Sequence, residues 1–229
     1  MNVFDQSIFD VVGRFAGQSA AFDDFVRRWV SDEIGFKGDL AMAAAWWVWF
    51  RRDSAQRERR AAVLGALIAT AAAVIFGRVL SHALPFRMRP FADPSLHLTL
   101  PLGSSRFGLR AWSSFPSDHA MVWGAIATGL GAASVGAGVF LWVVGLLLVC
   151  APRVYVGLHF PTDILGGLVV GALVGWVLTR PRICGLLSRP FFFCEERYPA
   201  WFYGAAFLLT LHLADMFAVL RNLGSALHG

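Results

Sequence analysis

Residues 61–84 read AAVLGALIATAAAVIFGRVLSHAL, an apolar run in which Arg78 is the only charged residue. A helix needs about 20 apolar residues to cross the roughly 30 Å core of a bilayer, and this run predicts such a helix. Of the 229 residues, 57% are hydrophobic and 15% are charged, whereas soluble domains average about 25% charged. Too little polar surface remains to cover a water-soluble globule, so we expect a membrane protein.

Five further apolar segments accompany this run, and they cover residues 34–50, 119–135, 139–151, 164–179 and 201–220. Together they predict an all-α, polytopic membrane bundle of about six transmembrane helices. Gly167, Gly171 and Gly175 recur every four residues and predict a close contact with a neighbouring helix. Because no repeat or domain boundary is evident, we expect residues 1–229 to form a single integral membrane domain.

The N-terminal residues 4–29 are not apolar enough to span a bilayer. Their apolar side chains follow a near-helical spacing and are interleaved with Asp and Arg. This pattern predicts an amphipathic helix in the membrane interface, broken near Gly17. An ordinary polar terminus is the alternative. Asp5 and Asp10 are acidic and no basic stretch precedes an apolar core, so we do not expect a cleavable signal peptide.

The basic residues predict an orientation in the membrane. The net charge is +5, and residues 51–60 hold five arginines and residues 180–197 hold four. Both stretches lie on one side if the spans alternate, and the positive-inside rule makes that side cytoplasmic. Residues 85–118 and 152–162 then lie outside. Residues 85–118 also hold four arginines, which weakens the charge bias, and we expect several of them to bind a phosphate. No polar segment combines aromatic and basic residues as nucleic-acid binding requires.

Three clusters of reactive side chains stand at the outer ends of the spans. They are residues 82–90 (HALPFRMRP), 115–119 (FPSDH) and 153–163 (RVYVGLHFPTD). Taken singly, an Arg-Pro is usually an interfacial anchor, a Pro-Ser-x-His a helix cap, and a His-x-x-x-Asp often a salt bridge at a helix start. Three such clusters in this order, on one predicted face, are much harder to explain in that way.

The first two clusters offer groups that bind an anion. The guanidinium of Arg89, like that of Arg153 in the third cluster, presents a planar fork of donors that matches phosphate oxygens. Ser117 and the backbone around Asp118 open a predicted helix, where unpaired N–H groups favour an anion. His119 stands one residue later, at the same helix start.

The third cluster adds a second histidine. His159 and Asp163 are four residues apart, so they can face each other across a helical turn. A carboxylate in that place would fix the histidine tautomer and support a positive imidazole. The clusters together suit phosphoryl transfer. The alternative is a zinc site made by His82, His119, His159 and Asp163, but nearby arginines would repel a cation. We therefore expect neither a metal nor a cofactor.

These clusters resemble the type 2 phosphatidic acid phosphatase superfamily, whose pattern is Lys-x6-Arg-Pro, Pro-Ser-x-His and Ser-Arg-x5-His-x3-Asp. The resemblance covers about residues 77–171, and the predicted span at residues 201–220 lies outside it. It implies His159 as nucleophile, His119 as general acid and base, and Asp163 as the residue that orients His159. It implies phosphate contacts from Arg89, Arg153, Ser117 and the backbone around Asp118.

Two positions depart from the family pattern. His82 stands at the position of the lysine, and Pro152 stands at the position of the serine before Arg153. Either His82 or Arg87 would then supply the missing phosphate contact. The reaction class does not depend on this substitution.

Within the superfamily, the FPSDH motif, the N-terminal segment and the length are most similar to bacterial undecaprenyl pyrophosphate phosphatases. The resemblance implies a metal-independent lipid phosphatase of the inner (cytoplasmic) membrane, with a phosphohistidine intermediate and a site facing the periplasm or exterior. Its partners would be a lipid phosphate or pyrophosphate and membrane lipids, with no nucleic acid and no obligate protein partner.

Several alternatives stay open at this point. They are a phosphatase of phosphatidic acid, phosphatidylglycerol phosphate or lipid A phosphate, a lipid-to-lipid phosphotransferase, and a non-catalytic polyprenyl phosphate binding or transport protein. His212 and Asp215, within the predicted span at residues 201–220, are either functional or a pair that stabilises helix packing.

Overall fold

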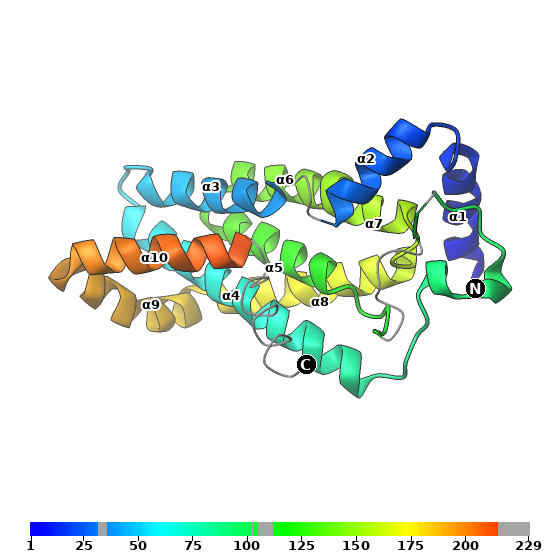
Figure 1. Cartoon of the computed structure of the whole chain (residues 1–229). Coiled ribbons are helices and arrows are strands. Elements are labelled where there is room, and N and C mark those ends of the chain that lie inside the picture. The colour runs from blue at the N-terminus through cyan, green and yellow to red at the C-terminus, as the bar shows by residue number, and fades with distance from the viewer. Residues whose placement is uncertain (32–35, 102, 105–111, 215–229) are drawn as a thin grey trace, which may run out of the picture.

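The computed structural model describes residues 1–31, 36–101, 103–104 and 112–214. The described residues form helices and no strands. In chain order the α-helices and the π-helical segment η4 are α1 (Val3–Phe15), α2 (Ala20–Val30), α3 (Lys37–Phe50), α4 (Gln56–Ala83), α5 (Asp118–Ala133), α6 (Val135–Val144), η4 (Gly145–Cys150), α7 (Ala151–Tyr155), α8 (Pro161–Leu178), α9 (Pro181–Arg197) and α10 (Pro199–Ala214). Short 3-10 turns η1 (Pro90–Ala92) and η2 (Pro94–Leu96) interrupt the connection after α4. Most of the long helices share one direction, while α1 stands across the end of the bundle (Figure 1).

The prediction of an all-α membrane bundle is confirmed, since each of the six predicted apolar spans overlaps helical residues. Residues 34–35 and 215–220 of these spans lie outside the described residues. Three described helices are long and apolar enough to cross a membrane, namely α4, the continuous stretch Val135–Tyr155 and α8. Helix α10 is apolar but shorter, with 16 residues. Helices α3 and α5 have 14 and 16 residues.

Helix α5 lies at the centre of the bundle, packed between α4 and α8. Glycines permit the contact with α8. A Cβ on Gly167 would lie 2.5 Å from the Ser117 carbonyl oxygen, and one on Gly175 would lie 2.5 Å from the Ala125 carbonyl oxygen. A Cβ on Gly171 would overlap the carbonyl oxygen of Met121. The predicted close contact along these three glycines is confirmed, and it sets two helix backbones side by side.

The N-terminal segment forms two helices rather than one. Helix α1 ends at Phe15, Gly17 adopts a φ of 80°, and Ser19 caps α2. A positive φ is accessible to glycine at little cost, so the predicted break near Gly17 is confirmed. Apolar side chains of both helices, such as Phe15 and Phe22, remain exposed, which suits a location in the membrane interface.

Residues 180–197 are not a simple connection. They form helix α9, which packs against α4. Its buried residues Cys184, Ser188 and Phe192 recur every four positions, a spacing that places them on one helical face. Its arginines indicate only an orientation in the membrane, whereas the spacing of these buried residues indicates a helix that we did not predict.

Helices α9 and α10 close the end of the bundle that faces away from α1 (Figure 1). Together with α3 and α4 they line an apolar cavity of about 680 Å³, bounded by Trp46, Trp49 and Phe202 among others. His212 lies on α10, which packs against α3 and α9. Asp215 lies outside the described residues. No residue of the three sequence clusters lines this cavity.

The glycine contact between α5 and α8 can be tested by adding one methyl group. We expect Gly171→Ala to lower the thermal midpoint in detergent, because the new Cβ would overlap the Met121 carbonyl and overpacking costs about 1–3 kcal/mol. Gly204→Ala in α10 is the matched control, since nothing lies within 4 Å of its added Cβ. It should leave the midpoint unchanged or raise it. An unchanged midpoint for Gly171→Ala would contradict the packing.

Candidate active site

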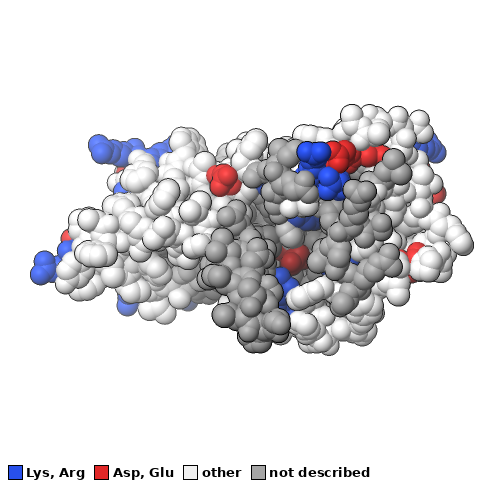
Figure 2. Space-filling model, viewed as in Figure 1, with Lys and Arg blue, Asp and Glu red and all other residues white. Residues whose placement is uncertain are grey.

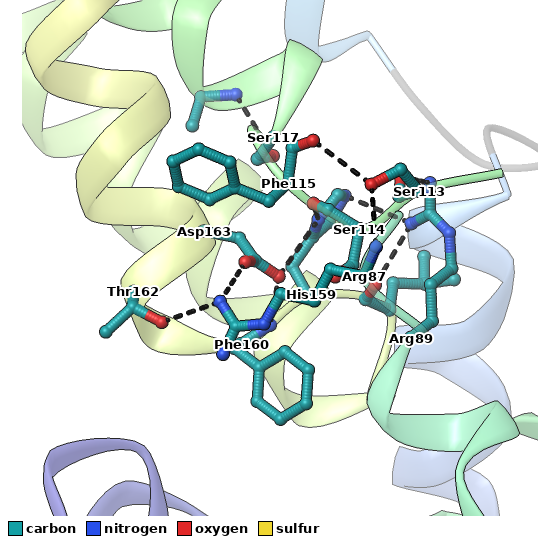
Figure 3. Close-up of polar contacts among 12 residues, drawn as sticks. Arg87, Arg89, Ser113, Ser114, Phe115, Ser117, His159, Phe160, Thr162 and Asp163 are labelled. Atoms are coloured by element: carbon teal, nitrogen blue, oxygen red, sulfur yellow. Dashed lines mark hydrogen bonds and ion pairs between the residues drawn. The ribbon is translucent and has the colours of Figure 1, made fainter. Parts of the chain in front are cut away.

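The three sequence clusters meet at the end of the bundle where α5 and α8 begin (Figure 3). Backbone hydrogen bonds join them. The amide of Ser114 donates to the carbonyl of Arg87 at 2.8 Å, and the amide of Ser117 donates to the carbonyl of Asp163 at 3.2 Å. The segment before α5 is thus hydrogen-bonded to the first cluster through Ser114 and to the start of α8 through Ser117.

A turn at Gly157 brings the third cluster to the first. Gly157 has a φ of 73°, and its carbonyl accepts a hydrogen bond from the amide of Phe91 at 2.9 Å. A Cβ there would lie 2.7 Å from a methyl carbon of Leu100. Both the backbone angle and the space therefore require glycine, and the turn delivers His159 two residues later.

His159 is held as a neutral imidazole. Its side chain is only 4% exposed, and its Nδ1 lies 2.8 Å from the carbonyl oxygen of Ser114, which can only accept a hydrogen bond. The proton is therefore on Nδ1, and Nε2 carries a lone pair 3.3 Å from Nη1 of Arg89. Burial, followed by the positive charge of Arg89, lowers the pKa of His159 to about 3. The ring is neutral at physiological pH, which suits a nucleophile.

Asp163 lies beside His159 but is not its hydrogen-bond partner. The distance from Asp163 Oδ2 to His159 Nδ1 is 3.8 Å, beyond hydrogen-bonding range. Oδ2 instead accepts from the amide of Phe160 at 2.8 Å, and Oδ1 accepts from Arg87 at 2.5 Å. The expected helical turn between the two residues does not form, because α8 begins at Pro161 and His159 precedes it.

The carboxylate–histidine pair with direct contact is the one at the start of α5. Asp118 Oδ1 accepts from the backbone amide of His119 and lies 2.8 Å from its Nδ1. Ser117 caps the helix by accepting a hydrogen bond from the amide of Ala120. The side chain of His119 is 26% exposed, so it is accessible from outside. Asp118, expected near the phosphate through its backbone, orients a histidine with its carboxylate.

Two buried arginines act on His159, one by contact and one through its charge. Arg89 donates to three carbonyl oxygens around the site, those of Trp112, Ser113 and Leu158. Arg153 is buried on α7 and donates to the carbonyl of Val149 at 3.1 Å. After burial and Arg89, the charge of Arg153 also contributes to the low pKa of His159. The structure therefore places Arg89 against the histidine, while Arg153 acts on it through its charge.

Arg87 and His82, the two candidates for the missing lysine, occupy different surroundings. Arg87 donates to Asp163 and to the Thr162 hydroxyl (Figure 3) and forms an ion pair with Asp5. Its guanidinium is thus engaged with acidic side chains. His82 is exposed on the last turn of α4, with its ring 6.0 Å from that of Trp112.

Arg78, which belongs to none of the three sequence clusters, lies one turn before His82 on the same face of α4. Its guanidinium lies 4.7 Å from the ring centre of Trp112, whose carbonyl accepts a hydrogen bond from Arg89. The pKa of Arg89 is lowered mainly by burial, and the charges of Arg153 and Arg78 lower it further. Arg78 is therefore close enough to the site to act on Arg89 through its charge. The i, i+4 spacing from His82 was the available signal.

These features define a class, a polytopic all-α membrane protein whose candidate anion site combines two histidines with buried arginines. Among the described residues, no group of three or more His, Cys, Asp or Glu side chains comes together that could hold a metal ion. The chain belongs to the PAP2 superfamily, which its residues 62–182 match.

Two relatives and one solved structure are similar to this chain. The undecaprenyl-diphosphatase BcrC of Bacillus subtilis is 32% identical over 120 residues, covering 51% of this chain and 56% of BcrC. An undecaprenyl-diphosphatase of Sulfolobus acidocaldarius is 28% identical over 79 residues, covering 33% of this chain and 37% of the relative. The chain thus spans about half the length of the first relative and less of the second.

The solved structure is a transmembrane PAP2-type phosphatidylglycerolphosphate phosphatase from Bacillus subtilis. It has 20% sequence identity and a TM-score of 0.35, with 77% of this chain and 92% of that chain covered.

The low pKa of His159 gives a prediction for its titration. We expect the ring nitrogens of the ¹⁵N-histidine-labelled protein, assigned with His159→Gln, to keep the shifts of a neutral ring protonated on Nδ1 from about pH 8 to about pH 5. An unperturbed histidine would gain a proton near pH 6.5, whereas the lowered pKa keeps this ring neutral far below that value. Protonation of His159 near pH 6.5 would contradict the buried geometry.

Proposed function

We propose that this protein is a membrane lipid phosphatase that hydrolyses the terminal phosphate of a polyprenyl pyrophosphate, converting undecaprenyl pyrophosphate to undecaprenyl phosphate. The observation that carries the proposal is the position of His159 Nε2, a neutral nucleophile 3.3 Å from a guanidinium nitrogen of Arg89. The names of the two relatives support the choice of substrate.

The proposed first step is an in-line attack of His159 Nε2 on the terminal phosphorus. A nitrogen–phosphorus bond forms as the bond to the bridging oxygen breaks, and His119 donates a proton to the leaving oxygen. Arg89 and Arg153, with Ser117 and the backbone amides at the start of α5, bind the equatorial oxygens. Such preorganised positive groups stabilise the charge of the transition state.

The second step hydrolyses the phosphohistidine. His119 takes a proton from water, the water oxygen bonds to phosphorus, and the bond to His159 Nε2 breaks to release inorganic phosphate. The carbonyl of Ser114 holds the proton on Nδ1 throughout. Asp163, at 3.8 Å, supports the positive charge that the imidazole carries in the intermediate. No metal enters the proposed reaction.

The proposed location is the inner membrane, with the site facing the periplasm or exterior. The arginine-rich α3–α4 connection lies at the end of the bundle opposite α1 (Figure 1), and Lys and Arg side chains gather there on the surface (Figure 2). Cytoplasmic ends of membrane helices are enriched in such residues. The site, near α1, is then on the outer side, where a lipid phosphate in the outer leaflet reaches it.

The missing lysine leads us to propose a phosphate-binding role for Arg78. Arg87 is engaged by Asp163 and by the N-terminal helix, and His82 is exposed beside Trp112. Arg78 projects from the same face of α4 and stacks on Trp112, next to the loop that holds Arg89. A guanidinium there could bind a phosphate oxygen that a lysine would otherwise contact.

The central prediction concerns phosphate release by the detergent-purified protein in EDTA. Undecaprenyl pyrophosphate should be cleaved faster than phosphatidic acid or phosphatidylglycerol phosphate. His159→Ala should abolish release, and His119→Ala should slow it about 10²- to 10⁴-fold because proton transfer is lost.

The matched control is His97→Asn. His97 is exposed on the same outer connection and has a φ of 48°, which asparagine tolerates. This variant should keep wild-type activity. Equal release by wild type and His159→Ala would refute the histidine mechanism, and no release from any substrate would favour a binding or transport role. Transfer of phosphate to an added lipid alcohol, in place of release, would indicate a phosphotransferase.

The two candidates on α4 can be separated by kinetics. Arg78→Gln should lower kcat/KM about tenfold or more, because a hydrogen bond to a charged group contributes about 1.5–3 kcal/mol. Arg78→Lys should restore part of the loss, and His82→Gln should change kcat/KM little. A larger loss for His82→Gln than for Arg78→Gln would assign the contact to His82.

A further inference from the structure

A carboxylate from the N-terminal helix reaches the start of α8. Asp5 on α1 is completely buried. Its Oδ1 accepts from the backbone amide of Thr162 at 2.9 Å, and its Oδ2 accepts from the Thr162 hydroxyl at 2.8 Å. The amide of Thr162 is among the first of α8, which lack partners within the helix. Asp5 therefore caps α8 from another element, and its charge complements the positive end of the helix.

The same carboxylate also holds Arg87. Asp5 Oδ2 lies 3.1 Å from Nη2 of Arg87, while Nη1 of Arg87 binds Oδ1 of Asp163 at 2.5 Å. The guanidinium thus bridges two carboxylates whose side chains are 0% exposed. Buried carboxylates such as those of Asp5 and Asp163 are tolerated when an opposite charge pairs with them, and here Arg87 is that charge. Because each carboxylate binds a different nitrogen of the guanidinium, the two together fix the orientation of Arg87. The ring of Phe160 lies against the guanidinium, 3.9 Å from its carbon.

A second contact ties α1 to the same place. Phe9, one helical turn after Asp5, is buried and packs edge-on against Phe160, with ring centroids 6.1 Å apart. Phe160 is the residue after His159 and donates its amide to Asp163. Helix α1 therefore contacts Thr162 and Arg87 through Asp5, and Phe160 through Phe9. Its opposite face keeps Phe4 and Val11 exposed, as expected for a helix in the membrane interface.

We propose that Asp5 is a positioning residue of the active site, through which the N-terminal helix fixes Arg87 and the start of α8 and thereby sets the places of Asp163 and His159. The inference rests on the proposed phosphatase activity. Asp5 touches neither His159 nor a reacting atom, so it acts through Arg87 and Thr162. Displacing a catalytic group by about 1 Å can cost about 10²-fold in rate, so its removal should affect catalysis.

The test compares two charge removals on the same helix. Asp5→Asn should lower kcat about 10- to 100-fold with little change in KM, because the substrate contacts remain while the catalytic groups shift. Asp10→Asn is the matched control, since Asp10 is exposed and accepts a hydrogen bond from Gln6 on the surface of α1. It should leave kcat unchanged. Equal kcat for Asp5→Asn and wild type would overturn the proposal.

A double-mutant cycle distinguishes positioning from general stabilisation. In the background of Arg87→Gln, Asp5→Asn should reduce kcat less than about twofold, because two residues in one network act together. Independent effects that multiply would contradict action through Arg87. If Asp5→Asn folds poorly, Thr162→Val can take its place in the test. This substitution keeps the shape of the side chain and removes the hydroxyl that Asp5 binds, so it should also lower kcat. Wild-type kcat for Thr162→Val in a folded protein would count against the network.

The outcomes also separate this inference from the proposed function. If the wild type releases no phosphate from any lipid substrate, the proposed phosphatase function fails. If the wild type is active and Asp5→Asn behaves like Asp10→Asn, only the positioning role fails. A shift of the His159 ring nitrogens in Asp5→Asn, absent in Asp10→Asn, would support the positioning role without reference to activity.

Discussion

The contact between α5 and α8 is the constraint on which the site depends. Glycines let the two backbones approach so closely that one added Cβ on α8 would overlap a carbonyl of α5. The hydrogen bond from Ser117 to the carbonyl of Asp163 then joins the two helix starts. Because both helices begin at the same end of the bundle, their first turns place His119 and Asp163 in one site.

Around that contact, buried and half-buried polar groups satisfy one another. The Ser114 carbonyl orients His159, Asp118 orients His119, and Asp163 pairs with Arg87. Buried charges are tolerated in this way because each has an opposite charge or a hydrogen-bond partner. The result is a neutral imidazole next to fixed guanidinium groups. In such an arrangement, burial lowers the basicity of the histidine and the guanidinium groups attract the anion that it would attack.

The N-terminal helix extends this network to the edge of the membrane. Its exposed apolar side chains suit the interface, while Asp5 points inward to α8. One short helix thus connects the lipid surface with the groups that surround His159. Helices α9 and α10 lie at the other end of the bundle, and among the described residues the apolar cavity that they help to line includes no residue of the three clusters.

The helical spans, the break at Gly17, the glycine contact and the residue clusters can be read from the sequence, because apolar length and fixed spacing act locally along the chain. Helix α9 could also have been predicted from the four-residue spacing of its buried side chains, although we interpreted its arginines only as an orientation signal. The hydrogen-bond partners, in contrast, become visible only in the folded protein. The partner of His159 Nδ1 is the carbonyl of Ser114, and the partners of Arg87 include Asp5. These residues are distant in sequence, and their contacts exist only once the loops are folded onto α5 and α8.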